Sequence, residues 1–191
     1  MVPLSGSGPG THDLRTRLWS GIALVGVVFL LLTSCTTGTS SSHGKEGYCG
    51  STDANSVTVI IDYGDLGPDP TVGCAYDLPE GATGFDALQA LGITVTQATR
   101  SQDFICRLEG YPTIDQIIPI PGRDTYRETC VNTPPQTAYW TYWNAAEGED
   151  WTYATRGYTT NPVIFGGFEG FAFAHNVPLA SAPPGIPATT P

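Results

Sequence analysis

Apolar and polar residues first follow a regular pattern at residues 57–63, where the sequence is VTVIIDY. The first five residues are all β-branched, and the pattern is typical of a half-buried strand. Residues 64–70 are rich in glycine, proline and aspartate, which mark turns. The sequence therefore predicts a strand, a turn and a partner strand over residues 71–78.

A helical spacing replaces this pattern after Thr83. Phe85, Leu88 and Leu91 recur three residues apart, which places them on one face of a helix. Threonine is a residue type that caps helix N-termini, and Gly92 is of the type that ends helices. We expect a short helix from Phe85 to Leu91 that packs through these three apolar side chains.

Shorter apolar and aromatic runs predict the remaining strands. These strands cover residues 93–96, 104–108, 138–143, 151–154 and 169–173. Prolines interrupt any regular element at residues 111–136, which we predict to be a long loop. A hairpin followed by one helix and further strands is an α+β order. We therefore expect one helix on one face of a mixed sheet.

The N-terminal region has the features of an export signal. Residues 1–20 include Arg15 and Arg17, and residues 21–32 carry no charge and are almost all apolar. A run of this length is too short to cross the ~30 Å hydrocarbon core of a bilayer comfortably. It matches the hydrophobic region of a signal peptide.

The sequence LTSC at residues 32–35 resembles the lipobox of bacterial lipoproteins. This resemblance implies cleavage before Cys35, lipidation of Cys35, and anchoring at the extracytoplasmic face of the cell membrane. Two or three acyl chains hold a protein durably at a bilayer. The alternatives are an uncleaved anchor and an ordinary secretory peptide in which Cys35 has no special role.

These features divide the chain into a signal peptide, a lipidated cysteine with a flexible tether, one domain and a disordered tail. The predicted parts are residues 1–34, 35–47, 48–175 and 176–191, in that order. The tether is rich in serine, threonine and glycine. The tail is rich in proline, alanine and threonine.

Four cysteines follow the lipidation candidate: Cys49, Cys74, Cys106 and Cys130. An even number outside the cytoplasm implies two disulfides, for which three connectivities are possible. We expect Cys49–Cys74 to bracket the first hairpin and Cys106–Cys130 to close the proline-rich loop. The domain has no C-x-x-C motif and a single histidine, His175, so no metal site is predicted.

The charge of the chain limits the classes of partner. It carries 18 acidic and 8 basic residues, a net charge of −10. Such a surface repels phosphate backbones, which argues against nucleic acid as a partner. Acidic residues cluster near residues 62–69 and 147–150 without the spacing of an EF-hand, so solvated turns are expected rather than Ca²⁺ sites.

No motif for catalysis or for cofactor binding occurs in the sequence. The G-x-S-x-G, H-E-x-x-H, P-loop and G-x-G-x-x-G patterns are all missing. We therefore expect neither an enzyme nor a bound cofactor. A pair of carboxylates that meet only in the folded protein stays open as an alternative.

Several motifs, taken in order, resemble one known family. They are GATGFDALQAL at residues 81–91, FICRLEG at 104–110, YWTYW at 139–143, WTY at 151–153 and EGF at 169–171. Their order and spacing are similar to those of the transcobalamin-like C-terminal domain family. The chain looks closest to an actinobacterial subgroup of surface lipoproteins within that family.

The resemblance covers about residues 49–173 and implies a β-grasp-like fold. It implies a binding or accessory module, because some members of the subgroup are encoded beside vitamin transporters. In transcobalamin the corresponding domain clasps a corrinoid against a helical barrel, which this chain lacks. We expect a lipid-anchored module that serves corrinoid-like vitamin uptake. The alternative is an envelope protein-interaction module without a small-molecule ligand.

The most aromatic predicted strand supplies the candidate binding residues. Trp140 and Tyr142 share one face of that strand, and we expect Trp151 and Tyr153 to extend it. Rigid aromatic rings offer contact area at a small entropic cost. An exposed platform of these four residues would bind a small planar ligand or a membrane transporter. The alternative is that the helix covers one face and the loop at residues 111–136 covers the other.

Overall fold

The main element of the protein is a six-stranded sheet in a computed structural model that describes residues 43–178 and 180–191. The strand order is β1-β3-β2-β8-β6-β7. In chain order the six strands are β1 (Gly44–Glu46), β2 (Val57–Asp62), β3 (Thr71–Ala75), β6 (Ala138–Ala145), β7 (Thr152–Tyr153) and β8 (Phe168–His175). The predicted signal peptide, Cys35 and most of the predicted tether lie outside the described residues.

The remaining elements lie outside this sheet. A separate two-stranded hairpin consists of β4 (Val95–Ala98) and β5 (Ser101–Leu108). The described residues contain one α-helix, α1 (Gly84–Ala90), and a 3-10 turn, η1 (Gly64–Leu66), between β2 and β3. Within the described parts of the chain, no helix is long and apolar enough to cross a membrane.

The sheet is mixed, as expected. Its central strands β2 and β8 run parallel, and every other neighbouring pair is antiparallel. Parallel neighbours require a long connection, and here the connection contains α1, the β4–β5 hairpin and β6. The α+β order with one helix is therefore confirmed.

Local sequence explains how α1 begins. The Thr83 side chain accepts a hydrogen bond from the backbone N–H of Asp86, and the Asp86 carboxylate accepts one from the backbone N–H of Thr83 at 2.7 Å. This reciprocal arrangement is a capping box. Leu88 is fully buried, and Phe85 and Leu91 pack partly buried against the same core. The predicted helix and its apolar face are confirmed.

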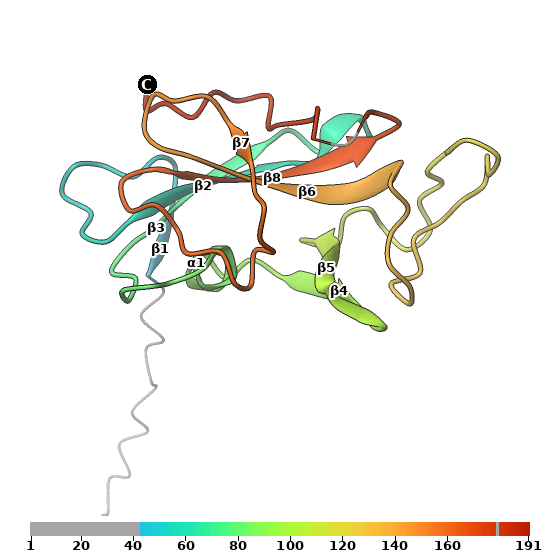
Figure 1. The fold of residues 1–191 in the computed structure, drawn as a ribbon, viewed down its shortest axis with the longest axis horizontal. Helices are drawn as coiled ribbons and strands as arrows, with labels where there is room; N and C mark the ends of the chain where they lie inside the picture. The colour runs from blue at the N-terminus through green and yellow to red at the C-terminus, as the bar shows by residue number, and fades with distance from the viewer. Residues whose placement is uncertain (1–42, 179) are drawn as a thin grey trace, which may run out of the picture. The chain divides into compact units, whose positions relative to one another are not determined.

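The two faces of the sheet are covered by different parts of the chain (Figure 1). On the inner face, Val59 and Ile61 of β2 join Leu88 of α1 in the main core. On the outer face, Ile60 of β2 packs with Ala188, close to the C-terminus, in a smaller cluster. Figure 1 shows the C-terminal residues, in red, above the sheet and α1 below it.

Two predicted boundaries of the domain are wrong. The domain does not begin at residue 48, because β1 lies within the predicted tether and pairs with β3. The described part of the predicted tail is also ordered. Its Gly185 N–H donates to Asp62 at 2.7 Å, and its Ile186 carbonyl accepts from the Trp151 indole N–H at 2.9 Å. Tertiary contacts therefore fix residues whose composition alone predicts flexibility.

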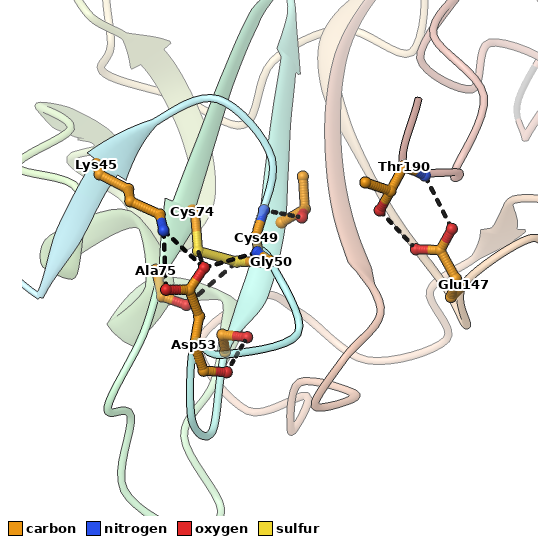
Figure 2. The surroundings of a disulfide bond; sticks show 10 residues. Lys45, Cys49, Gly50, Asp53, Cys74, Ala75, Glu147 and Thr190 are labelled. Atoms are coloured by element: carbon orange, nitrogen blue, oxygen red, sulfur yellow. Dashed lines mark hydrogen bonds and ion pairs between the residues drawn. A yellow bond between two sulfur atoms is a disulfide. The ribbon is translucent and has the colours of Figure 1, made fainter.

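Both predicted disulfides are present. The Cα atoms of Cys49 and Cys74 lie 4.8 Å apart, and those of Cys106 and Cys130 lie 5.4 Å apart. Figure 2 shows the first bond beside Asp53, whose carboxylate accepts hydrogen bonds from Lys45 at 2.7 Å and from the Gly50 N–H at 2.6 Å. These hydrogen bonds, that of Lys45 foremost, lower the pKa of Asp53.

The long loop at residues 111–136 contains neither a helix nor a strand and is fixed near both ends. The Cys106–Cys130 disulfide joins its far end to β5. The Arg107 side chain donates to the carbonyl of Pro112 at 2.8 Å and to the carbonyl of Glu128 at 2.5 Å. A single arginine thus spans the two ends of the loop.

Candidate functional site

The structure separates the four aromatic residues that were predicted to form one platform. Trp140 and Tyr142 point to the inner face and are only 7% and 9% exposed, as members of the main core. Tyr153 opposes Trp143 across the β6–β7 ladder, and cross-strand partners share a face. Tyr153 therefore belongs to the outer face, where Trp151 also packs. The predicted open platform is wrong.

The helix and the long loop both cover the inner-face rings of β6, whereas the alternative prediction placed them on opposite faces; C-terminal residues cover the outer face. Trp140 packs edge-on against Tyr63 and Phe173, with ring centroids 5.7 and 5.5 Å away. Its indole N–H donates to the carbonyl of Tyr111, at the start of the long loop, at 3.3 Å. The Tyr142 hydroxyl lies beneath Gly84 of α1, where an added Cβ would approach it to 2.8 Å. Packing therefore buries most of the surface of both rings, which gives them a structural role.

Three of the four predicted residues nevertheless line one groove, which we call the aromatic groove. Its volume is about 470 Å³, within the range of small-molecule sites. Residues from β5, from β6, from the end of β7 and from the segment that follows β7 form its walls. They are Asp103, Phe104, Ile105, Tyr139, Trp140, Tyr142, Tyr153, Ala154, Thr155, Arg156, Gly157 and Tyr158.

The groove follows an edge of β6 that no described strand covers. Strand β7 pairs only with Trp143 and Asn144. Beyond them, the N–H of Ala154 donates to the carbonyl of Tyr142 at 3.0 Å. Main-chain groups on an antiparallel strand alternate between its two sides. The N–H and C=O of Trp140 therefore point to the same side as the carbonyl of Tyr142, toward the groove.

The rim of the groove adds an exposed ring and two opposite charges. Phe104 of β5 is 45% exposed. Asp103, its neighbour, lines the groove on the β5 side, and Arg156 lines it from the segment after β7. Tyr158 is buried in the wall, where its hydroxyl accepts a hydrogen bond from Gln97 at 2.7 Å. Burial raises the pKa of Tyr158 further above its ordinary value, so its hydroxyl stays protonated at physiological pH.

A buried carboxyl lies behind the groove wall. Glu169 of β8 has no exposed surface and accepts a hydrogen bond from the Tyr142 hydroxyl. Burial disfavours the charged carboxylate and raises the pKa of Glu169 to about 8. Asn161 donates to the same hydroxyl at 3.4 Å. These contacts hold the Tyr142 ring at a fixed position in the wall.

Sequence reasoning missed Phe104, Asp103 and Arg156. Phe104 directly precedes Ile105, which is buried, so the alternation of side chains along a strand places Phe104 outward. That signal was available in the sequence. Asp103 and Arg156 gave no such signal, because only the tertiary approach of β5 to the segment after β7 brings them to one groove.

A second groove of about 520 Å³ lies at the other end of the sheet. Val59 and Ile61 of β2 contribute to its lining, together with Leu91 and Ile93 from the chain after α1. It contains none of the predicted site residues. Its lining includes β1, which the sequence did not predict.

The described residues contain two clusters with metal-ligating side chains. Each consists of one carboxylate and the two sulfurs of a disulfide: Asp53 with Cys49–Cys74, and Glu128 with Cys106–Cys130. A metal ligand of cysteine is the thiolate, which an oxidised pair does not offer. These clusters are therefore disulfide environments.

The chain was compared with known protein families, with curated proteins and with solved structures. None of the three comparisons gives a match.

Proposed function

We propose that this protein is a lipid-anchored, extracytoplasmic binding module that holds its ligand in the aromatic groove. The observation that carries this proposal is a groove of about 470 Å³ with aromatic walls from three separate elements. The export signal and the lipobox-like sequence at residues 32–35 support the location. The lack of catalytic motifs in the sequence supports binding rather than catalysis.

For the ligand we propose a planar, corrinoid-like vitamin that the module presents to a membrane transporter. The resemblance of the chain to the transcobalamin-like C-terminal domains, with their β-grasp-like fold, motivates this choice. The groove suits a planar molecule because Phe104 presents a partly exposed ring at its rim. Asp103 and Arg156 provide an acceptor and a donor for polar substituents around the plane.

A matched pair of phenylalanines tests this proposal. Phe104 and Phe165 are exposed to 45% and 40%, but only Phe104 lines the groove. The purified domain is titrated with cyanocobalamin while its tryptophan fluorescence is followed. Phe104→Ala should weaken binding about tenfold by removing a stacking surface, and Phe165→Ala should leave it unchanged. No binding by the wild type, or equal binding by all three proteins, would contradict the proposal.

The uncovered edge of β6 favours a second candidate, an envelope protein-interaction module. An extended segment of a partner can add a strand to such an edge. Main-chain pairing would then protect the Trp140 amide from hydrogen exchange, because that amide points to the open edge. A small ligand that stacks on Phe104 would not pair with this amide. Hydrogen exchange with and without the ligand or partner separates the two candidates.

A further inference from the structure

The C-terminal residues bind to a trough on the outer face of the sheet. We call residues 180–191 the tail segment. The outer trough is formed by six residues from β2, β6, β8 and the β6–β7 connection: Asp62, Thr141, Glu147, Gly148, Trp151 and Gly170. The tail segment contains no helix or strand. It runs over the sheet on the side opposite α1 (Figure 1).

Most of the hydrogen bonds in the trough are made to main-chain groups of the tail segment. The Trp151 indole N–H donates to the carbonyl of Ile186 at 2.9 Å, and the Gly148 N–H donates to the carbonyl of Ala188 at 2.8 Å. At the other end, the Thr141 hydroxyl donates to the carbonyl of Ala172 at 2.8 Å and shares this proton with the carbonyl of Ala182 at 3.2 Å. A site that binds main-chain carbonyls can bind segments of many sequences, provided that they share the same backbone conformation.

One proline is seated where the sheet has no side chain. Pro184 is buried, and a Cβ added to Gly170 would lie 2.7 Å from its ring and 2.9 Å from the Trp151 ring. Pro184 and Pro187 are spaced as P-x-x-P. Only Pro184 is seated, against the single aromatic ring of Trp151, and Pro187 is exposed. Grooves that seat a proline on an aromatic ring are used by proteins that bind proline-rich segments.

The tail segment leaves part of the trough unfilled. A solvent-open hollow of about 250 Å³ lies beside the Gly148–Ala188 hydrogen bond, between the stretch from Pro187 to Thr189 and the β6–β7 connection, and Glu149 and Asp150 line it. Next to it, Glu147 accepts hydrogen bonds from the Thr190 N–H and hydroxyl at 2.8 and 3.0 Å (Figure 2). Glu147 is thus engaged by the tail segment, whereas Glu149 and Asp150 are exposed and complementary to a basic side chain after the second proline.

We propose that the outer trough is a binding site for extended P-x-x-P segments with a basic residue after the second proline. The tail segment is its resident occupant in cis, and a segment of a partner protein replaces it in trans. The small residues of the tail segment and its main-chain hydrogen bonds are those of an extended docked segment, which also buries Pro184 and Ala188 against the outer cluster. This site is separate from the aromatic groove and does not depend on its ligand.

The test uses a chain that ends at residue 178 and a fluorescent peptide of residues 180–191. Fluorescence anisotropy should show that the peptide binds the shortened chain and binds the full chain at least about tenfold more weakly, because the resident tail competes. Replacing Pro184 and Pro187 of the peptide with alanine should abolish binding. A T189R peptide should bind about threefold more tightly, and high salt should remove this gain.

Two glycines provide a matched control. Gly170→Leu should abolish peptide binding, because its side chain would occupy the place of Pro184. Gly50→Ala should not affect binding, because the nearest atom to its added Cβ is 3.7 Å away and belongs to Asp53. A folded shortened chain that ignores the peptide would overturn the proposal, as would equal binding of the proline-free peptide.

A second format covers the case in which the shortened chain does not fold. A protease site placed in the connection at residues 176–181 allows the tail segment to be cut from the full chain after folding. The cut protein should exchange its tail segment for the labelled peptide while it keeps its secondary structure. Unfolding on release of the tail segment, or no exchange, would show that the segment is core and would overturn the proposal.

Discussion

Glu169 has the least ordinary environment of any acidic group described here. It is fully buried on the central strand β8 and bonded to the Tyr142 hydroxyl, and its pKa is raised to about 8. At neutral pH this carboxyl is therefore mostly protonated, and the wall of the aromatic groove contains a neutral polar pair. The pair of Glu169 and Tyr142 stays neutral only at pH values at which the Glu169 carboxyl is protonated.

Stability should decrease as pH rises from about 4.5 to about 8. The unfolded chain releases the Glu169 proton near the ordinary value of 4.5, whereas the folded chain retains it up to about 8. The folded state therefore binds more protons in this window, and raising pH favours unfolding. The stabilisation is complete below the window and lost above it. Urea unfolding at several pH values measures this slope.

Glu169→Gln provides the comparison for that slope. Glutamine keeps the shape and cannot ionise, so the variant should lack a decrease on the order of 5 kcal/mol across the window. Glu149→Gln, at an exposed position, should keep the wild-type slope. Equal slopes for the wild type and Glu169→Gln would show that Glu169 does not titrate as a buried group.

Trp140→Ala should destabilise the fold rather than act only on binding. The ring is in the main core between Tyr63 and Phe173, so its removal should lower the free energy of unfolding by about 3–5 kcal/mol. Phe104→Ala removes a ring that is 45% exposed and should change stability by less than about 1 kcal/mol. Denaturant unfolding of both variants checks this. If Trp140→Ala lowers the free energy of unfolding by less than about 1 kcal/mol, the ring is not part of the core.

At the scale of elements, those with strong local signals could be predicted from sequence. Strand β2 has a β-branched run, and α1 has both an apolar spacing and a capping residue. Strand β1 has the sequence GKE, which carries no apolar pattern, and it is a strand only because it pairs with β3. Pairing between distant segments is a tertiary effect that a local pattern does not contain.

The candidate site was predictable in part for the same reason. The aromatic residues of β6 mark the groove, but the faces of β7 depend on its register with β6. Tyr153 opposes Trp143, an outer-face residue, so Trp151 and Tyr153 extend the outer face rather than that of Trp140. The sequence of β2 did indicate a second covering segment. The strand is apolar at consecutive positions, and a strand that is apolar on both faces must be covered on both.

Leu88→Ala tests the packing of α1 on the sheet. Leu88 has no exposed surface, so its truncation should lower the free energy of unfolding by about 2–5 kcal/mol. Gln89→Ala on the exposed side of the same helix should be near neutral, because alanine is a better helix former. Thermal or urea unfolding measures both. Similar losses for the two variants would contradict the observed helix register.

Reduction should destabilise the domain through both cross-links. Each disulfide joins residues 24 or 25 positions apart, and closing a loop of this length contributes roughly 3.5 kcal/mol in the chain-entropy account. Unfolding curves with and without a reductant measure the combined effect, and free-thiol titration gives the control. Unchanged stability after complete reduction would mean that noncovalent packing alone fixes the fold.

At the scale of the whole molecule, one sheet carries the two surfaces for which we propose binding. The aromatic groove opens at the β6 edge beside β5, and the outer trough lies on the face opposite α1. Burial on both faces explains how a domain with one short helix can retain a core: the helix and hairpin cover one face, and the tail segment covers the other.

Cys35→Ala tests the proposed anchoring of the whole molecule. Wild-type protein should partition into the detergent phase and the membrane fraction, because acyl chains on Cys35 would hold it at the bilayer. The variant has no acylation site and should appear in the aqueous phase. Cys49→Ala changes a cysteine of the domain and should leave the partitioning as in the wild type. Identical aqueous partitioning of wild type and Cys35→Ala would contradict the lipoprotein proposal.

Strand β1 also limits the length of the tether between Cys35 and the domain. It holds the chain from Gly44 onward, so only the residues between Cys35 and His43 are left to bridge lipid and domain. A fully extended chain of this length spans at most about 28 Å. An acylated Cys35 would thus confine the module to a thin layer above the bilayer, where its local concentration around an integral membrane protein reaches roughly the millimolar range. The module would then contact only proteins within the length of this tether. Lengthening the tether should lower the local concentration of the module around such a protein.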